Sequence, residues 1–195
     1  MVWNDELKRE IPEGWSIKTL GDLLLKNTEK LQNYSNTPTM DLSVMKPDNI
    51  ALGELNDSDN FSTNLFVMKK GDLLFGSIRP YLHKSGIAPC NGAVAGTVHS
   101  YKPVNVKDYN ICLSALTNND IFSFAVKNAK GTKMPVISSD DLMRYKILYN
   151  KNISNKFTEL LDVKNIICNC MMQNNILRQL KNDILPLLIN GQLNI

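Results

Sequence analysis

The chain has 195 residues, of which 43% are apolar and 21% are charged, a composition that excludes an intrinsically disordered protein and allows one compact domain with an extension. Lys and Arg outnumber Asp and Glu by 22 to 19, which gives a formal net charge of +3. This excess permits nucleic-acid binding but is smaller than that of most proteins that bind DNA tightly by themselves.

Membrane insertion, secretion and metal binding find no support in the sequence. There is no run of 18 or more apolar residues and no apolar segment at the N-terminus, so we expect neither a transmembrane helix nor a signal peptide. The four cysteines have no disulfide or zinc spacing, and we expect free thiols in a reducing cytoplasm. We therefore predict a cytoplasmic protein that contacts no membrane and holds no metal and no cofactor.

The first part of the chain is typical of short strands separated by polar turns. Thr19 precedes an apolar run and suits the N-cap of a brief helix. In chain order we expect a polar lead-in over 1–14, a strand over 15–18, a helix over 20–26, a loop over 27–38 and a strand over 39–45.

The middle of the chain continues in the same way, with apolar runs punctuated by glycines. Residues 65–68 and 73–78 predict a hairpin around a turn at 69–72. The further expected elements are strands over 85–88 and 94–101, a helix over 108–127, a loop over 128–135, a capped helical turn over 138–143 and a strand over 144–148. Residues 1–150 thus predict one globular α+β domain of short strands and helices.

Residues 151–195 predict a single long helix with a short tail. Apolar residues recur at steps of three and four, which places one stripe along a helix. A helix over 152–185 would be about 50 Å long at ~1.5 Å per residue, close to a short coiled coil. The stripe consists of Ile153, Phe157, Leu160, Val163, Ile167, Cys170, Leu177, Leu180 and Ile184.

A helix of this kind needs a second helix to cover its stripe, and the chain offers no other segment of matching length. The partner is therefore expected to be another chain, and the stripe residues from Phe157 to Ile184 are the candidate dimerisation residues. Asn174 interrupts the stripe. It could set the register of a helix pair, or it could mark a locally wet helix.

Catalysis has little support. Neither His83 nor His99 lies in a metal-binding or nucleophile motif, and both are interpreted as ordinary surface or loop residues. Phosphate-binding glycine motifs are also absent. We expect a protein that is not an enzyme.

Two polar segments carry chemistry suited to nucleic acid. In 71–86 a strand leads into a turn with Ser77, Arg79, Tyr81 and Lys84, where Arg79 could be bidentate to guanine and Ser77 or Lys84 could reach phosphates. A solvated hairpin end explains these residues equally well.

The second segment is the loop over 127–135. Lys130, Thr132 and Lys133 with exposed backbone N–H groups would suit phosphates. A charge cluster that is merely solvated is the alternative for this loop.

Four segments taken together, in order and over nearly the whole chain, resemble the specificity subunit of type I restriction-modification systems. They are Ile11-Pro-Glu-Gly-Trp-Ser-Ile-Lys-Thr-Leu-Gly-Asp22, Gly71-Asp-Leu-Leu-Phe-Gly-Ser-Ile-Arg-Pro-Tyr81, Lys130-Gly-Thr-Lys-Met-Pro-Val-Ile-Ser-Ser-Asp-Asp-Leu142 and Leu177-Arg-Gln-Leu-Lys-Asn-Asp-Ile-Leu-Pro-Leu-Leu-Ile-Asn-Gly-Gln192.

The resemblance implies a half-size subunit. Such subunits ordinarily carry two target-recognition domains and two long antiparallel helices, whereas this chain has one of each. It implies a non-catalytic protein that binds double-stranded DNA and directs methyltransferase and restriction subunits to a bipartite site, as a homodimer or paired with another half-subunit. The alternative is an interaction adaptor that uses the same helix but never meets DNA.

Overall fold

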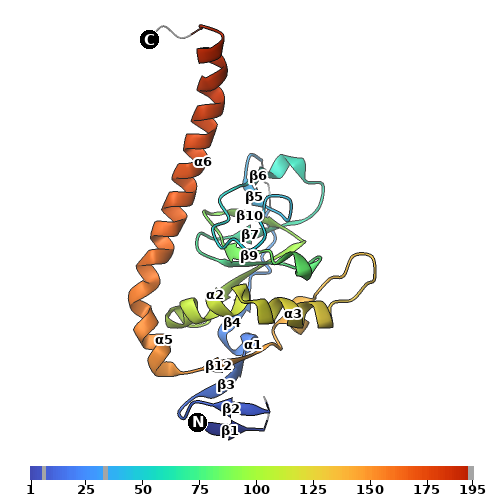
Figure 1. The fold of residues 1–195 in the computed structure, drawn as a ribbon. Coiled ribbons are helices and arrows are strands. Elements are labelled where there is room, and N and C mark those ends of the chain that lie inside the picture. Colours follow the sequence, from blue (N-terminus) through green and yellow to red (C-terminus); the bar gives the residue numbers. More distant parts are fainter. Residues whose placement is uncertain (6–7, 33–34, 193–195) are drawn as a thin grey trace.

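A computed structural model describes residues 1–5, 8–32 and 35–192. Small parts of the expected lead-in, of the 27–38 loop and of the C-terminal tail lie outside the described residues. Short strands and helices form one body, and a long helix runs along its side and projects beyond it (Figure 1). The expected α+β class with a long C-terminal helix is confirmed.

The N-terminal end contains a hairpin where only a polar lead-in was expected. Strands β1 (Val2–Asn4) and β2 (Arg9–Ile11) pair antiparallel. Strand β3 (Ser16–Thr19) pairs antiparallel with β12 (Lys146–Tyr149), so the two ends of the domain meet. The helix expected over 20–26 is shorter: α1 (Leu20–Leu23) follows Thr19, and β4 (Leu24–Lys26) then joins a sheet.

Two four-stranded sheets form the middle of the domain. One has the order β6-β5-β10-β7 and the other the order β4-β11-β8-β9. Strand β5 lies parallel to β10, and the other neighbours are antiparallel. Their bounds are β5 (Pro38–Met40), β6 (Asn56–Asp57), β7 (Leu65–Met68), β8 (Leu73–Gly76), β9 (Ser85–Ile87), β10 (Gly92–Ala95) and β11 (Val98–Pro103).

The hairpin predicted from 65–68 and 73–78 is wrong, because β7 and β8 belong to different sheets. The turn between them is tied elsewhere: Gly71 at φ +86° donates its N–H to the Ala88 carbonyl. The carboxylate of Asp72 accepts hydrogen bonds from the Lys69 N–H and the Ser100 hydroxyl. Burial raises the pKa of Asp72. The turn therefore carries the chain from one sheet to the other.

Three further expectations about segment length are corrected. The strand expected over 39–45 ends at Met40, and the strand expected over 94–101 divides into β10 and β11, one in each sheet. The helix expected over 108–127 breaks at Asn118, whose backbone is extended (ψ 162°) and whose side chain accepts from the Ile121 N–H. The result is two helices, α2 (Tyr109–Thr117) and α3 (Asn119–Asn128).

The remaining short helices and 3-10 turns connect the strands and the longer helices along the chain. The turn expected over 138–143 is α4 (Ser139–Leu142), and the Ser138 hydroxyl accepts the Asp141 N–H at 3.1 Å. The largest apolar cluster lies where α1, α2 and α3 cover β8 and β11, and a second cluster lies between β5, β7, β8 and β10. The 3-10 turns are η1 (Ser58–Asn60), η2 (Pro80–Leu82) and η3 (Val106–Asp108).

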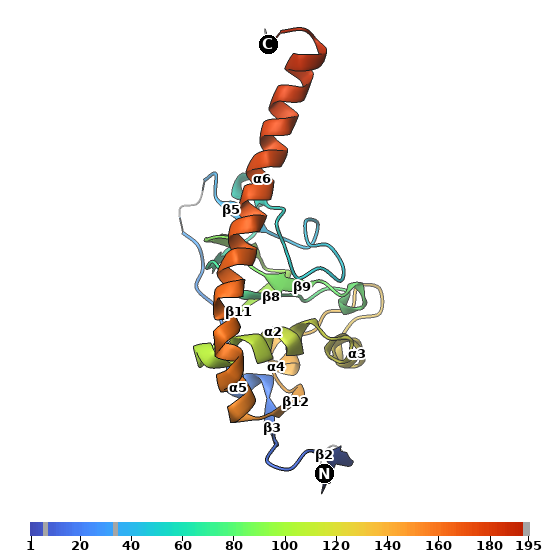
Figure 2. The same ribbon diagram turned by 60° about the vertical axis from the view of Figure 1, so that its left-hand side comes forward.

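The C-terminal helix is nearly continuous. It comprises α5 (Lys151–Phe157), a 3-10 turn η4 (Thr158–Leu160) and α6 (Leu161–Ile189), so it begins where expected and ends slightly beyond residue 185. One face of α6 lies on the domain, and its distal part extends past it (Figures 1 and 2). None of the helices described is both long and apolar enough to cross a membrane.

Candidate nucleic-acid interface

The two polar segments singled out in the sequence meet at one edge of the domain. The backbone N–H of Arg79 donates to the Pro135 carbonyl at 2.7 Å, and Ile78 forms an antiparallel bridge with Val136. Val136 also pairs with Lys130, whose N–H and carbonyl both bond to it at 2.9 Å. Residues 130–136 therefore form a small loop whose two ends are joined by backbone hydrogen bonds, called the tied loop below. This loop lies against the turn after β8.

The turn itself has an unusual backbone. Arg79 (φ 51°, ψ 60°) and His83 (φ 50°, ψ 45°) flank η2 and are both left-handed. The Leu82 N–H donates to the Arg79 carbonyl, and the His83 N–H donates to the Pro80 carbonyl. Residues other than glycine adopt this region rarely, since each residue in it costs about 1–2 kcal/mol. The surrounding contacts must therefore hold this turn in place.

The candidate residues divide into an exposed group and an internal group. Arg79, Tyr81, Lys130, Thr132 and Lys133 are exposed. Among the described residues, the guanidinium of Arg79 has no hydrogen bond or ion pair, whereas the ammonium of Lys130 lies 3.9 Å from an Asp141 oxygen with its side chain 87% exposed. Solvent screening makes such an exposed pair weak, so Lys130 remains available to another anion.

Ser77 and Lys84 point into the protein instead. Ser77 is 2% exposed, and its hydroxyl donates to the Thr97 carbonyl at 2.8 Å. The Lys84 ammonium donates to the Leu42 carbonyl at 2.7 Å. The polar groups of these two side chains bond to backbone carbonyls of the protein and so hold the turn and the neighbouring loop. They do not point toward the exposed edge, where a phosphate would bind.

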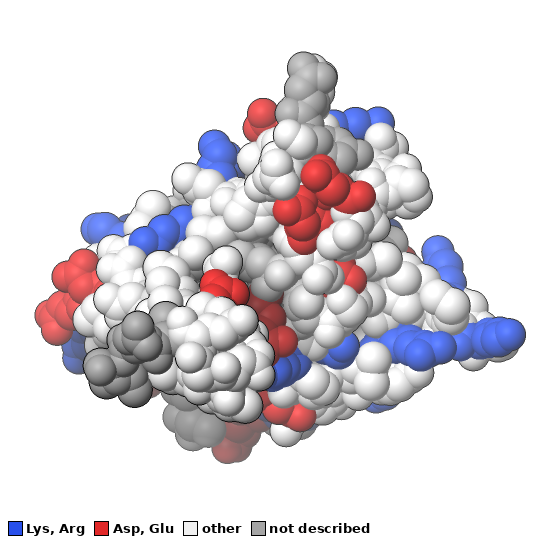
Figure 3. Space-filling view, turned by 90° about the horizontal axis from the view of Figure 1, so that it is seen from above, with Lys and Arg blue, Asp and Glu red and all other residues white. Residues whose placement is uncertain are grey.

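Lys and Arg atoms gather on this side of the molecule. In the view from above a row of Lys and Arg atoms runs out to the right-hand tip, the side on which the loop after α3 projects in Figure 1, and further Lys and Arg atoms lie on the left-hand side (Figure 3). An acidic group beside these cations is Asp141, whose pKa is lowered chiefly by the hydrogen bond from the Ser138 hydroxyl, with smaller contributions from Lys130 and Arg144. The edge thus combines cationic side chains with a rigid turn.

Two apolar residues of the edge were not anticipated. Met134 and Val136 are exposed within the tied loop. Gly131 (φ +99°) begins the turn that presents them, and a Cβ there would lie 3.1 Å from the Met134 carbonyl oxygen. The apolar pair within an otherwise polar loop was the sequence signal that could have identified them.

One of the two histidines, His99, differs from the sequence interpretation. His99 lies in the interior on β11, and its Nε2 lies 3.3 Å from the Ile137 carbonyl oxygen. Burial lowers the pKa of His99 to about 4, so the ring is neutral at pH 7. The reading of His99 as a surface or loop residue is therefore wrong, while His83 does lie in a loop and is partly exposed. Within the described residues, no group of three or more His, Cys, Asp or Glu side chains could hold a metal.

The apolar stripe of the C-terminal helix forms a second, separate surface. Phe157, Leu160, Val163, Leu177 and Leu180 are all between 41% and 60% exposed. Cys170 and Asn174 are exposed among them, and Ile153, Ile167 and Ile184 are half-buried. Near the free end, a hollow of about 260 Å³ is lined by Leu177, Leu180, Lys181, Ile184, Leu185 and Leu188. Ile167 packs partly against the domain, whereas the exposed members of the stripe are not covered by the described part of the chain.

A face of the helix that adjoins the stripe is fixed to the domain by packing and hydrogen bonds. Cys168 and Met171 are buried in a small cluster with Ile87. The Ser154 hydroxyl donates to an Asp108 oxygen at 2.5 Å, and Arg178 pairs with Glu54 at 2.9 Å. The helix therefore holds a defined direction relative to the domain, with the stripe turned outward.

Comparisons with known proteins find a similar curated sequence and solved structures with a similar fold. No family model matches the chain. A type I restriction enzyme MjaIX specificity subunit from Methanocaldococcus jannaschii is 27% identical to this chain over an alignment of 215 positions. The alignment covers 100% of this chain and 48% of that protein. The chain spans about half the length of the curated relative it matches.

Two solved structures share the fold. A chain from a study of complex assembly and conformational transition of the type I R-M system superposes with a TM-score of 0.64 at 14% identity, covering 94% of this chain and 50% of the other. The HsdS subunit from Thermoanaerobacter tengcongensis superposes with a TM-score of 0.53 at 16% identity, covering 95% of this chain and 47% of the other. Both matches again involve one half of the longer chain.

Proposed function

We propose that this chain, which aligns with about half the length of type I restriction enzyme specificity subunits, recognises DNA for a type I restriction-modification complex. It binds double-stranded DNA and directs methyltransferase and restriction subunits to a specific site. It performs no catalysis itself. Two copies, or this chain and a different half-subunit, act together on a bipartite target.

The observation that carries the proposal is the meeting of the Arg79 turn and the 130–136 loop at one exposed edge. Arg79 has a fixed backbone and a guanidinium that is unpaired among the described residues, which suits a bidentate contact to guanine in the major groove. Lys130, Thr132 and Lys133 contact phosphates, which set the register of the domain on the duplex. Tyr81 adds an exposed ring beside them, and Ser77 and Lys84 support the turn from within.

The outward stripe of the helix supplies the second half of the proposal. A helix of 29 residues is about 43 Å long at ~1.5 Å per residue, and its exposed leucines require a partner helix. An antiparallel pair with a second copy places one domain at each end of a rigid spacer. Identical domains related by a twofold axis read inverted half-sites, so the target has two short specific parts around a gap of unread bases.

The modest charge indicates that other subunits contribute to affinity. A net charge of +3 allows few counterions to be released on binding, so the chain alone binds weakly and with a shallow salt dependence. Methyltransferase subunits that enclose the DNA supply the remaining contacts.

The proposal is tested by selecting DNA from a pool of duplexes of random sequence, using the chain in complex with its methyltransferase subunit. The expected result is an enriched pair of inverted half-sites at a constant spacing, with binding that weakens as salt rises. A complex that forms but retains no DNA at any salt concentration would contradict the proposal and favour the adaptor function.

A further inference from the structure

His83 and Asp48 form a small cluster beside the Arg79 turn that the expected chemistry does not use. We propose that the contacts of His83 with Asp48 and Phe122 are a positioning clamp that holds the Arg79 turn and thereby sets base specificity where Arg79 reads DNA. The inference rests on the proposed function, and it makes His83 and Asp48 positioning residues that do not touch DNA themselves.

Backbone conformation is the first observation. Asp48 (φ 51°), Arg79 (φ 51°) and His83 (φ 50°) are three of the left-handed non-glycine residues within the described chain, and all three lie at this one place. Such residues persist only where surrounding contacts hold them. The Asp48 N–H donates to the His83 carbonyl at 3.0 Å, which ties the left-handed end of the turn to the loop before Asn49.

Side-chain contacts reinforce this link. The His83 Nδ1 lies 3.0 Å from an Asp48 oxygen. The His83 ring stacks on Phe122, with ring centroids 4.4 Å apart and planes within 8°. Phe122 is itself buried on α3 and stacks on Phe75 of β8 at 5.5 Å. The histidine therefore connects the exposed turn to the main apolar core.

The space around His83 shows that packing alone does not hold the ring. A cavity of about 140 Å³ lies beside it, lined by Asp48, Ile50, Thr117 and Phe122 among others. An imidazole released from Asp48 has room to move into this space. The hydrogen bond and the stack thus act together with the backbone hydrogen bonds in holding the observed conformation of the turn.

The conformation of the turn matters for recognition because Arg79 lies at the end opposite His83. Arg79 is anchored through its backbone N–H to Pro135, while its guanidinium is unpaired among the described residues. A bidentate contact to a base requires the side chain to leave the backbone at a fixed place and angle. Holding His83 four residues later keeps the whole turn, and hence the Arg79 backbone, in one conformation.

The test compares clamp variants with matched controls in the full chain. His83→Ala and Asp48→Ala remove the hydrogen bond, and Asp48→Ala changes a side chain that is 71% exposed, so this variant removes no core packing. Asp48→Asn keeps tolerance of the left-handed region and a hydrogen-bonding group, and serves as the conservative rescue. Lys8→Ala changes another left-handed residue, at φ 49° in the N-terminal hairpin, away from the turn.

The first measurement is amide hydrogen exchange by NMR. The Leu82 and His83 amides, which close the turn, should exchange about tenfold faster in His83→Ala and Asp48→Ala, since one hydrogen bond or one aromatic stack controls the local opening. Asp48→Asn and Lys8→Ala should match the wild type, and amides of β8 and β11 should not change in any variant. Exchange of the turn amides within twofold of wild type in both alanine variants would overturn the clamp.

The second measurement is selection from the random duplex pool with the methyltransferase complex. The alanine variants should lose preference at one base position, the position that Arg79→Ala also relaxes, while the slope of binding against salt stays unchanged. Faster exchange with an unchanged base preference would overturn the positioning role. If the wild-type complex selects no sequence, the proposed function fails, and the exchange measurement still decides whether the clamp exists.

Discussion

The Arg79 N–H and the Pro135 carbonyl oxygen lie 2.7 Å apart, and this contact joins two polar segments that are far apart in the sequence. It places an exposed arginine beside a loop with two exposed lysines at one edge of the domain. The predictions about DNA follow from this juxtaposition, and those about assembly follow from the outward stripe of the helix.

Replacing Arg79 with alanine should relax specificity at one base position. The loss of a bidentate contact costs about 1–3 kcal/mol of discrimination at that position and little elsewhere. Arg144→Ala is the matched control, because Arg144 is also exposed but pairs with Asp141 at 3.5 Å. Competition between duplexes that differ at single positions measures the effect. An unchanged profile in Arg79→Ala would remove this assignment without removing the bipartite target.

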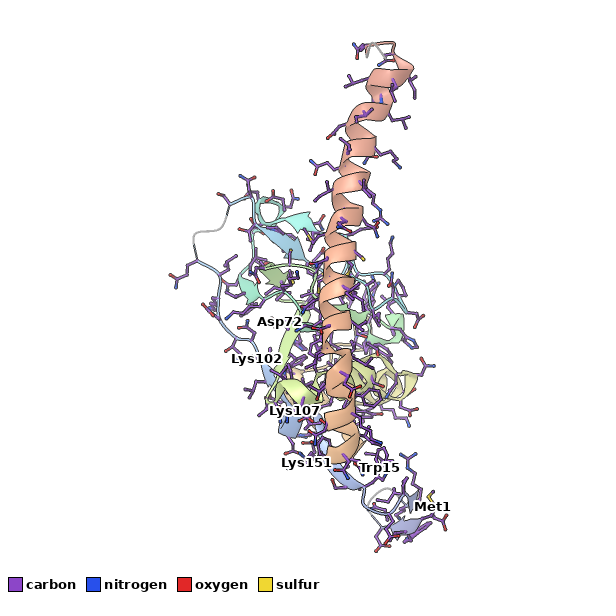
Figure 4. All side chains as sticks on the ribbon, turned by 90° about the vertical axis from the view of Figure 1, so that its left-hand side faces the viewer. Met1, Trp15, Asp72, Lys102, Lys107 and Lys151 are labelled. Carbon is purple, nitrogen blue, oxygen red and sulfur yellow. The ribbon has the colours of Figure 1, made fainter. Side chains whose placement is uncertain are left out.

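Replacing Lys133 with alanine should weaken binding to all sequences about equally. A lost phosphate contact reduces the slope of log K against log salt by about one. Lys151→Ala is a suitable control, because this substitution removes the same charge at a different place. Lys151 lies at the start of the long helix (Figure 4). Titrations at several salt concentrations provide both slopes. Equal slopes for the Lys133 variant and the wild type would place Lys133 outside the interface.

Replacing Leu177 with aspartate should prevent self-association and leave the chain folded. Leu177 is 60% exposed in the single chain, so folding does not depend on it, whereas a carboxylate inside a helix–helix interface is strongly unfavourable. Asn165→Asp, at an exposed position outside the stripe, introduces the same charge as a control. Sedimentation equilibrium should show a dimer for the control and a monomer for the Leu177 variant. Identical behaviour of the two variants would mean that the stripe is not the interface.

Stability should fall as the pH drops from about 6.5 toward 4, because of His99. Burial lowers the pKa of His99 in the folded chain from 6.5 to about 4, so the unfolded chain binds the additional proton in this window. The expected loss is at most about 1.4 kcal/mol per pH unit from this group. His99→Gln removes the titration and should flatten the profile measured by denaturant unfolding at several pH values. A slope in this window that is identical in the variant and the wild type would contradict the assignment to His99.

The sequence predicted the long helix and its stripe because an amphipathic pattern is local and keeps one period for many residues. The polar and charged residues of 71–86 and 127–135 also identified both polar segments of the edge. Their meeting was not predictable, since the bridge from Ile78 to Val136 is a long-range pairing that leaves no local signal.

The errors have equally specific causes. A turn at 69–72 that joins two sheets has the same residue types as a hairpin turn, and long-range contacts such as the hydrogen bond from Gly71 to Ala88 distinguish the two. The helix break at Asn118 depends on a single side chain that caps α3 in place of continuing α2. The burial of His99 follows from its place on a central strand, which composition does not indicate.

The most direct test of the central claim is mapping of DNA methylation in cells that carry the methyltransferase gene, with and without the gene for this chain. The proposal predicts that methylation depending on this chain occurs at a bipartite motif. When the chain pairs with itself, the two half-sites should be inverted repeats around a gap of constant length. A contiguous motif, or a methylation pattern that does not change when the gene is removed, would contradict it.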